Sequence, residues 1–354
     1  MKQNAGQLIR ISKLLCVTAS LAIFLTATTT TYARKPRSLR AVVKTSPSSP
    51  FGINAHIPST EDFKLMHQAG ISWVRVDFTW DVLEPRKGVY RWDISDRVVL
   101  DAKTYGINIL AILGYCPRWA SSGGDKTFPP RSKHQWMGFV RAIVNRYKGN
   151  IHYWTLWNEP NSETFFHGNI DSFINDVLIP GATAAKEADR SCRIVGPDLA
   201  HLGGSNWDKW FDGILHRVGG YLDVISHHCY KDKPYNVLNA LDGSKRLWDR
   251  RRVKSIIKRR NQENKPFWLT EVGWRSTKIG EERQAGYEVA LLKGIERRPW
   301  IRKVFLFELR DSPGLPGYGL LNRNGTPKPA YTAYAGFIAS KSGKNRVKGH
   351  CCPK

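Results

Sequence analysis

The stretch that decides the fold is Leu156-Trp157-Asn158-Glu159-Pro160-Asn161. It completes a short apolar run that begins at Ile151, and a proline directly follows the glutamate. A carboxylate between a strand and a chain-breaking proline is expected on a turn at the strand's carboxyl end. In a barrel of alternating strands and helices, catalytic residues gather at that end of the strands.

A second apolar run delivers a second carboxylate. The run Phe267-Trp268-Leu269-Thr270 leads directly to Glu271, and Val272-Gly273-Trp274 follows. Two strand-end carboxylates are what glycoside hydrolysis needs, one as acid and base and one as nucleophile or water activator.

The rest of the chain repeats this pattern of strand and helix. Eight short apolar runs alternate with longer helical patterns, and the runs begin near Phe51, Trp73, Ile107, Ile151, Arg193, Tyr221, Pro266 and Lys303. This alternation predicts an α/β fold with a parallel sheet, and eight units predict one (β/α)₈ barrel domain over residues 51–340. An open doubly wound sheet is the alternative, but no glycine-rich phosphate loop follows the first run.

The two motifs, in this order, resemble those of the retaining glycoside hydrolases of clan A. Family 39, with its bacterial exopolysaccharide hydrolases, is the nearest match, and family 5 is the second choice. The resemblance covers roughly residues 51–338. It implies that Glu159 is the acid/base and Glu271 the nucleophile. We expect no cofactor.

The resemblance also implies roles for neighbours of the two carboxylates. Arg75 lies inside an apolar run, where a charge is costly unless it is paired. Its position matches an arginine that hydrogen-bonds the nucleophile in clan A, and a structural ion pair with Asp77 is the alternative. Asn158 is expected to bind the sugar 2-hydroxyl group.

The segment His227-His228-Cys229-Tyr230 would suggest a metal site if taken alone. Consecutive side chains of a strand face opposite ways, so the two histidines are poorly placed to share one ion, and we predict no metal. His228 and Tyr230 match the His-x-Tyr pair that borders the nucleophile in clan A.

Three further residues are candidates for substrate binding. His56 ends the first run and could line the pocket floor, although a structural role is as plausible. Trp119 and Trp274 follow strand ends, where an indole can stack on a sugar, and rigid loop packing is the alternative for Trp119. The last run reads Phe305-Leu306-Phe307-Glu308, where many clan A members have a tryptophan, and this departure leaves the sugar undefined.

The ends of the chain differ from its middle. Residues 1–33 combine three basic residues, an apolar stretch from Leu14 to Thr26 and the small-residue site Thr31-Tyr32-Ala33, which together predict a signal peptide. That stretch is shorter than the roughly 20 residues of a membrane-spanning helix. We therefore expect export to the periplasm or the extracellular space. Residues 34–50 read as a basic, Ser/Pro-rich linker and residues 341–354 as a basic tail.

The formal net charge is +25 and the pI about 9.9. This excess makes anionic polysaccharides candidate partners and allows peripheral contact with anionic surfaces. We expect no nucleic-acid binding, because there is no recognition motif and the export signal argues against it. The chain does not indicate an oligomeric state. Five cysteines remain beyond residue 33, an odd number without zinc-ribbon spacing, so we expect no essential disulfide framework.

The resulting functional prediction is an exported retaining glycoside hydrolase. It would cleave β-glycosidic bonds within a polysaccharide by double displacement. A transglycosylase would use the same residues, and a non-catalytic carbohydrate-binding barrel would have lost a carboxylate. These two alternatives stay open.

Overall fold

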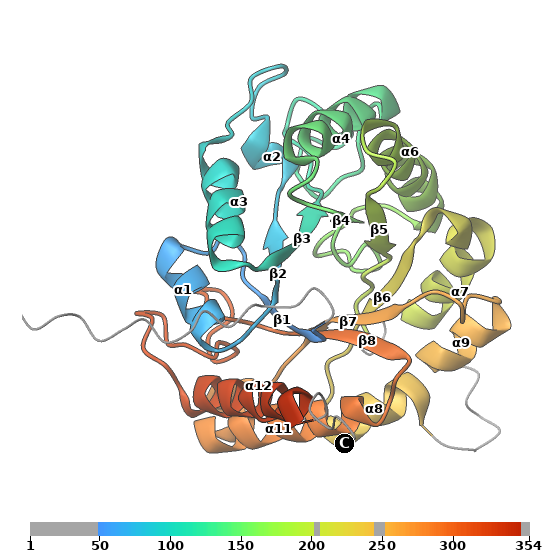
Figure 1. Ribbon diagram of the computed structural model, residues 1–354. Coiled ribbons are helices and arrows are strands. Elements are labelled where there is room, and N and C mark those ends of the chain that lie inside the picture. The colour runs from blue at the N-terminus through green and yellow to red at the C-terminus, as the bar shows by residue number, and fades with distance from the viewer. Residues whose placement is uncertain (1–48, 202–205, 244–251, 348–354) are drawn as a thin grey trace, which may run out of the picture. The chain divides into compact units, whose positions relative to one another are not determined.

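The computed structural model describes residues 49–201, 206–243 and 252–347. Eight parallel strands form a closed barrel in chain order, and helices surround it (Figure 1). This confirms the predicted (β/α)₈ fold. The strands are β1 (Phe51–Asn54), β2 (Trp73–Asp77), β3 (Asn108–Leu113), β4 (Tyr153–Leu156), β5 (Arg193–Gly196), β6 (Val224–His228), β7 (Phe267–Val272) and β8 (Ile301–Leu306).

The helices alternate with these strands. They are α1 (Thr60–Gln68), α2 (Trp80–Leu83), α3 (Asp93–Tyr105), α4 (Lys133–Tyr147), α5 (Ile170–Ser172), α6 (Ile179–Ala188), α7 (Trp207–Val218), α8 (Pro234–Asp242), α9 (Val253–Arg259), α10 (Ser276–Ile279), α11 (Glu281–Glu296) and α12 (Pro329–Val347). A π-helical turn, η1 (Phe173–Leu178), joins α5 to α6, and a 3₁₀ turn, η2 (Gly219–Tyr221), follows α7.

Two predicted boundaries differ from the structure. Strand β6 begins at Val224, whereas the apolar pattern predicted a start near Tyr221, because the pair Gly219-Gly220 opens a 3₁₀ turn there. Helix α12 continues to Val347, into the segment predicted as a tail. The predicted signal peptide and nearly all of the linker, as well as residues 348–354, lie outside the described residues.

The interior of the barrel has an apolar end and a polar end. Trp73, Trp268 and Phe305 pack with Leu110, Val195 and Val224 in one buried cluster. Trp73 begins β2, so this cluster fills the amino end of the barrel, and the Nζ of Lys303 lies 4.1 Å from the Trp73 ring. The apolar filling leaves the opposite, carboxyl end for polar groups.

The carboxyl ends of β3, β4 and β5 carry unusual backbone conformations. Tyr115, Trp157, Glu159 and Asp198 all have positive φ angles, between 45° and 82°. Side chains other than glycine rarely adopt this region, and such residues cluster at functional sites. The clustering indicates where the site lies.

Cys116, Cys192 and Cys229 are buried free thiols. Within residues 49–201, 206–243 and 252–347, no helix has both the length and the hydropathy that crossing a membrane requires.

Candidate active site

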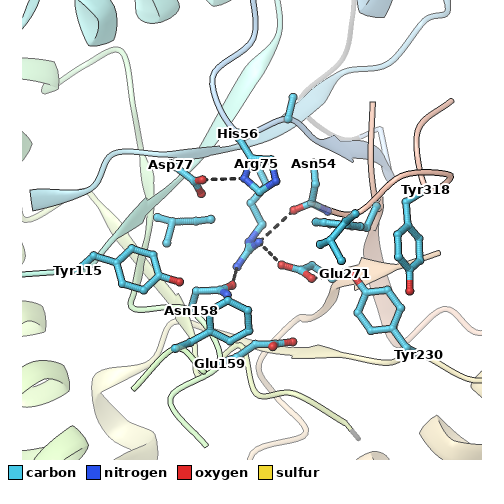
Figure 2. Close-up of a pocket in the computed structure, with 15 residues that line it drawn as sticks. Asn54, His56, Arg75, Asp77, Tyr115, Asn158, Glu159, Tyr230, Glu271 and Tyr318 are labelled. Atoms are coloured by element: carbon cyan, nitrogen blue, oxygen red, sulfur yellow. Dashed lines mark hydrogen bonds and ion pairs between the residues drawn. The ribbon is translucent and has the colours of Figure 1, made fainter. Parts of the chain in front are cut away.

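A cavity of about 320 Å³ opens at the carboxyl ends of the strands. Figure 2 shows Arg75 extending across it, with Asn158 and Glu159 on one side and Glu271, Tyr230 and Tyr318 on another. The lining includes six of the residues predicted from sequence: His56, Arg75, Asn158, Glu159, Tyr230 and Glu271.

Glu271 lies near the end of β7, where two side chains donate hydrogen bonds to it and an imidazole lies close by. Its Oε1 accepts a hydrogen bond from Arg75 Nη1 at 2.6 Å, and its Oε2 accepts one from the Tyr230 hydroxyl at 2.7 Å. The Nδ1 of His228 lies 3.4 Å from the same Oε2. Burial, and then the nearby charge of Glu271, raise the pKa of Tyr230 well above its usual value, so this hydroxyl keeps its proton and donates. The arrangement fixes the orientation of a carboxylate that lines the cavity.

Glu159 lies on the turn after β4, as the proline that follows it predicted. Its backbone N–H donates to the carbonyl oxygen of Asp198 at 3.0 Å, and its Oε1 pairs with His228 Nδ1 at 2.8 Å. Burial raises the pKa of Glu159, the hydrogen bond from His228 opposes this, and Glu271 raises the pKa further. The net direction is upward, which suits a group that must hold a proton for a leaving group.

The two carboxyl groups are close together. One oxygen of Glu159, one of Glu271 and a ring nitrogen of His228 all lie within 4.8 Å of one another. Carboxyl groups about 5 to 5.5 Å apart are typical of retaining glycosidases, and separations of about 6.5 to 9.5 Å are typical of inverting ones. The close approach corresponds to the shorter spacing.

Arg75 joins four acceptors. Besides Glu271, its guanidinium donates to Asn54 Oδ1 at 3.0 Å, to Asn158 Oδ1 at 2.7 Å and to Asp198 Oδ2 at 2.9 Å. Burial alone would lower the pKa of Arg75, but Asp198 and Glu271 raise it above its usual value. The predicted hydrogen bond between Arg75 and Glu271 is therefore present. Asp77, the alternative partner considered for Arg75, forms a hydrogen bond with His56.

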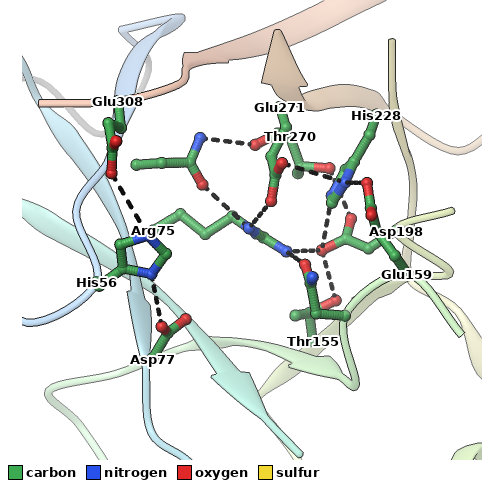
Figure 3. Close-up of polar contacts among 12 residues, drawn as sticks. His56, Arg75, Asp77, Thr155, Glu159, Asp198, His228, Thr270, Glu271 and Glu308 are labelled. Atoms are coloured by element: carbon green, nitrogen blue, oxygen red, sulfur yellow. Dashed lines mark hydrogen bonds and ion pairs between the residues drawn. The ribbon is translucent and has the colours of Figure 1, made fainter. Parts of the chain in front are cut away.

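Asp198, which sequence reasoning missed, connects side chains from several strands close to the two glutamates (Figure 3). Its Oδ1 accepts hydrogen bonds from Ser226 and Thr270, and its Oδ2 accepts from Arg75 and Thr155. Burial would raise the pKa of Asp198, but the charges of Arg75 and His228 hold it well below its usual value. A carboxylate after the predicted strand at Arg193 was the available signal.

His228 lies between the carboxyl groups and is fully buried. Burial would lower its pKa, but Glu271, Asp198 and Glu159 together raise the pKa of His228 to about 9. His227 faces away and pairs with His201, with 3.1 Å between Nε2 and Nδ1. The opposite orientation of the two histidines agrees with their predicted alternation along the strand.

The close group formed by Glu159, His228 and Glu271 has the dimensions of a metal site. The donor atoms are already engaged, because His228 pairs with Glu159 while Arg75 and Tyr230 hold the two oxygens of Glu271. These contacts fit a proton-transfer centre better.

The structure places His56 in the lining of the cavity, with a side chain that is 53% exposed. Its Nδ1 is 2.8 Å from Asp77 Oδ2 and its Nε2 is 3.4 Å from Glu308 Oε2. Hydrogen bonds to Asp77 and then to Glu308 raise the pKa of His56 to about 10. An imidazolium therefore lies between two carboxylates at the rim.

The structure places the two predicted stacking tryptophans outside the cavity. The indole N–H of Trp119 donates to the carbonyl of Glu84 at 3.1 Å, and its ring packs edge-on against Trp80. Trp274 is buried, donates to the carbonyl of Lys231 at 2.7 Å and packs against Tyr287. Both indoles are held by loop contacts, which accounts for their positions without a sugar.

Other aromatic side chains line the cavity in their place. These are Tyr115, Phe165, Phe307 and Tyr318. Phe307 directly follows β8, in the region where many clan A members have a tryptophan. Its ring packs edge-on against Tyr230 and Tyr318. Sequence could not rank these residues, because aromatic residues occur on nearly every loop of this chain.

A (β/α)₈ barrel with two facing glutamates at the carboxyl ends of β4 and β7 has the architecture of a glycoside hydrolase. Residues 130–334 match the family model described as glycosyl hydrolase catalytic core, and residues 55–122 match one described as beta-galactosidase. The first match covers more than half of the chain. The chain belongs to the glycosyl hydrolase catalytic core family, which confirms the resemblance to clan A glycoside hydrolases.

Individual proteins show the same relationship. A beta-xylosidase of Caldicellulosiruptor saccharolyticus is 25% identical over 252 residues, which cover 63% of this chain and 51% of that protein. An endo-1,4-beta-xylanase C of Phanerodontia chrysosporium is 26% identical over 126 residues, 32% of this chain and 30% of that protein. The chain thus spans about half the length, or less, of these curated relatives.

Solved structures share the fold. A family 39 glycoside hydrolase from Bacteroides cellulosilyticus WH2 superposes with a TM-score of 0.66 at 22% identity, over 82% of this chain and 63% of that chain. A family 39 beta-xylosidase from Caulobacter crescentus gives a TM-score of 0.66 at 21% identity, over 85% and 73% of the two chains. Family 39, the nearest match from the sequence motifs, is thus represented among the similar structures.

Proposed function

We propose that the protein hydrolyses β-glycosidic bonds of a polysaccharide or oligosaccharide with retention of configuration. The observation that carries the proposal is the pair of buried glutamates within 4.8 Å of each other and in different surroundings. Glu271 faces donors that suit an anion, and Glu159 has a raised pKa that suits an acid. The xylosidases and xylanases among the relatives make xylosides the first substrates to test.

The proposed reaction has two displacements. An oxygen of Glu271 attacks the anomeric carbon, the bond to the leaving oxygen breaks, and Glu159 gives its proton to that oxygen. Glu159, now a carboxylate, takes a proton from water, and the water oxygen replaces Glu271 at the anomeric carbon. Asn158, whose Oδ1 is held by Arg75, would direct its amide N–H groups toward the sugar 2-hydroxyl.

The test is the release of reducing ends from neutral and acidic secreted polysaccharides and xylan. Wild type is compared with Glu159→Gln and Glu271→Gln, with Glu187→Gln on the exposed face of α6 as the matched control. We expect activity in wild type and Glu187→Gln and its loss in the two site variants. Retained activity in Glu271→Gln would remove the nucleophile assignment, and product of inverted configuration by NMR would remove retention.

The same experiment separates the alternatives. A transglycosylase would give longer oligosaccharides at high acceptor concentration, whereas a hydrolase gives free reducing ends. A binding barrel would retain polysaccharide without cleaving it. The presence of both glutamates in one cavity favours hydrolysis over binding alone.

We also propose that the chain is exported and acts within a polymer outside the cytoplasm. The support is the charged and apolar pattern of residues 1–33. Expression of the full chain with N-terminal sequencing of the mature product tests this. A new terminus near Arg34 in the periplasm or medium is the expected result, and an uncleaved cytoplasmic chain would contradict it.

A further inference from the structure

One wall of the catalytic cavity belongs to the segment that joins β8 to α12, residues 307–328. This β8–α12 loop contains no helix. Its side chains that line the cavity are Phe307, Leu315 and Tyr318. Tyr318 lies beside Tyr230 in Figure 2, and the two rings pack edge-on with their centroids 5.9 Å apart. Tyr230 donates to Glu271, so the position of the loop affects the surroundings of the proposed nucleophile.

A carboxylate outside the cavity holds the backbone of this loop. The Oδ1 of Asp311 accepts hydrogen bonds from the backbone N–H groups of Gly317 at 2.9 Å and Gly319 at 2.7 Å. Its Oδ2 accepts from the Nζ of Lys328 at 2.6 Å. The side chains of Lys328 and Asp311 are 2% and 15% exposed, and neither lines the cavity. Asp311 therefore fixes the chain on both sides of Tyr318.

Gln284 on α11 holds the same stretch through its carbonyl groups. This side chain is fully buried, and its Nε2 donates to the backbone oxygens of Trp274 at 2.9 Å, Gly317 at 3.0 Å and Tyr318 at 3.1 Å. An amide nitrogen has two protons, so the three acceptors share them. Amide groups of the loop thus bind Asp311 while its carbonyl groups bind Gln284.

Stability alone does not account for a buried ion pair of this kind. Taking the ammonium of Lys328 out of water costs free energy, and apolar side chains of similar volume often stabilise a protein as well as a buried ion pair does. An apolar side chain in place of Asp311, however, could not accept hydrogen bonds from two backbone N–H groups. The carboxylate provides a defined backbone conformation around Tyr318, which apolar packing would not specify.

We propose that Asp311, held by Lys328, is a positioning residue for the catalytic cavity. It fixes the loop backbone so that the ring of Tyr318 stays against Tyr230, the tyrosine that donates to Glu271. The inference rests on the proposed function, because a change in turnover is its expected consequence. A loop released from Asp311 leaves the cavity wall in its present position for a smaller part of the time, and small displacements of positioning groups reduce turnover strongly.

The first test measures kcat/KM of Asp311→Ala with 4-nitrophenyl β-xyloside. We expect a decrease of about 10-fold to 100-fold, because the groups around the substrate are no longer held in reactive geometry. The matched control is Asp242→Ala on α8. Its carboxylate is 13% exposed, binds Arg298 and the indole N–H of Trp300, and lies outside the cavity lining. A wild-type kcat/KM in folded Asp311→Ala, or an equal loss in the control, would overturn the positioning role.

A double-mutant cycle shows whether Asp311 acts through Tyr318. Once Tyr318→Ala has removed the ring, Asp311→Ala is expected to change kcat/KM by less than about twofold, because residues that act through one another are not additive. Tyr318→Phe keeps the ring, so Asp311→Ala should retain its full effect in that background. If the effects of Asp311→Ala and Tyr318→Ala multiply, the two residues act independently and the proposed route is wrong.

Hydrogen exchange provides a readout that needs no turnover. The amides of Gly317 and Gly319 are expected to exchange at least about tenfold faster in Asp311→Ala than in wild type, because they lose their acceptor. Asp242→Ala should leave them unchanged. If Asp311→Ala does not fold, Lys328→Met, which removes only the ion pair, should accelerate the same amides by a smaller factor.

The two readouts separate this inference from the proposed function. Absence of turnover with every glycoside would reject the proposed function, while faster exchange in Asp311→Ala would still show that the carboxylate fixes the cavity wall. Unchanged exchange of both amides in the Asp311 and Lys328 variants would overturn the positioning role, even in a fully active hydrolase.

Discussion

The carboxylate of Asp198 lies 2.9 Å from the guanidinium of Arg75, and both side chains are almost fully buried, at 0% and 2% exposure. The same Arg75 holds Glu271, and the backbone carbonyl of Asp198 holds the amide of Glu159. One acidic residue thus supports both glutamates without lining the cavity. Its contacts hold Arg75 and the backbone of Glu159 in place.

Asp198→Asn is expected to reduce both stability and turnover. Removing one partner of a buried ion pair leaves an uncompensated charge, which typically costs about 3–5 kcal/mol. We expect a free energy of unfolding lower by about 3 kcal/mol and a kcat lower by about 100-fold, because Arg75 loses one of its two carboxylate partners and is held less precisely beside Glu271. Urea unfolding and steady-state kinetics measure the two effects.

The control for this variant is Asp96→Asn, which breaks the exposed pair with Arg146. Exposed ion pairs contribute about 0–1 kcal/mol, so this control should remain close to wild type. A kcat equal to wild type in folded Asp198→Asn would show that Asp198 has no positioning role.

His228→Asn is expected to shift the basic limb of the pH profile of kcat/KM to higher pH. The proton on His228 favours the ionised form of Glu159, which lies 2.8 Å away and is also close to Glu271 and Arg75. Without this hydrogen bond, the pKa of Glu159 rises further, and the acid stays protonated to higher pH. The measurement is the initial rate of wild type and His228→Asn at pH values from about 4 to 10. A basic limb that stays in place or moves to lower pH would contradict the assignment of Glu159 as the acid that His228 influences.

Tyr230→Phe removes the hydrogen bond of 2.7 Å to Glu271. We expect kcat to fall by about 10-fold to 100-fold, because an oriented donor to the nucleophile is lost, while the cavity keeps its shape. Tyr318→Phe removes a hydroxyl from the same cavity and is the matched control. If both variants lower kcat equally, the hydrogen bond from the Tyr230 hydroxyl to Glu271 has no specific effect on turnover.

The surroundings of Glu288 on α11 predict how the free energy of unfolding depends on pH. It is buried, and neither carboxylate oxygen has a hydrogen-bond partner among the described residues. Burial raises the pKa of Glu288 well above its usual value, and Lys328 opposes this only in part. The folded state therefore keeps the proton to higher pH than the unfolded state does, and the free energy of unfolding falls as the pH rises above the ordinary pKa of 4.5.

Glu288→Gln keeps an uncharged side chain at every pH. Its free energy of unfolding should exceed that of wild type at pH 7 by more than it does at pH 4, since only wild type loses stability by ionisation. Urea unfolding at the two pH values tests this. The same difference between wild type and variant at both pH values would mean that Glu288 does not titrate with folding.

The sequence by itself determined the barrel, the two glutamates and several of their neighbours. The reason is local: strand length, helical periodicity and the proline after Glu159 are properties of short segments, and the carboxyl ends of parallel strands must meet at one end of a barrel. Arg75, His228 and Tyr230 were assigned to the site through the resemblance of their segments to clan A glycoside hydrolases, and the structure places all three beside Glu271.

Only the tertiary structure decided which groups touch. Asp198 reaches Arg75, Ser226 and Thr270 from separate strands, a convergence that no local pattern encodes. Trp119 and Trp274 turn into loop contacts instead of the cavity, because the backbone carbonyls they bind come from other segments of the chain. A cavity of about 330 Å³ likewise forms because α2 and α3 pack beside the segments that follow β1 and β2. Such contacts depend on the closure of the whole barrel, and a sequence pattern extends only as far as its own element.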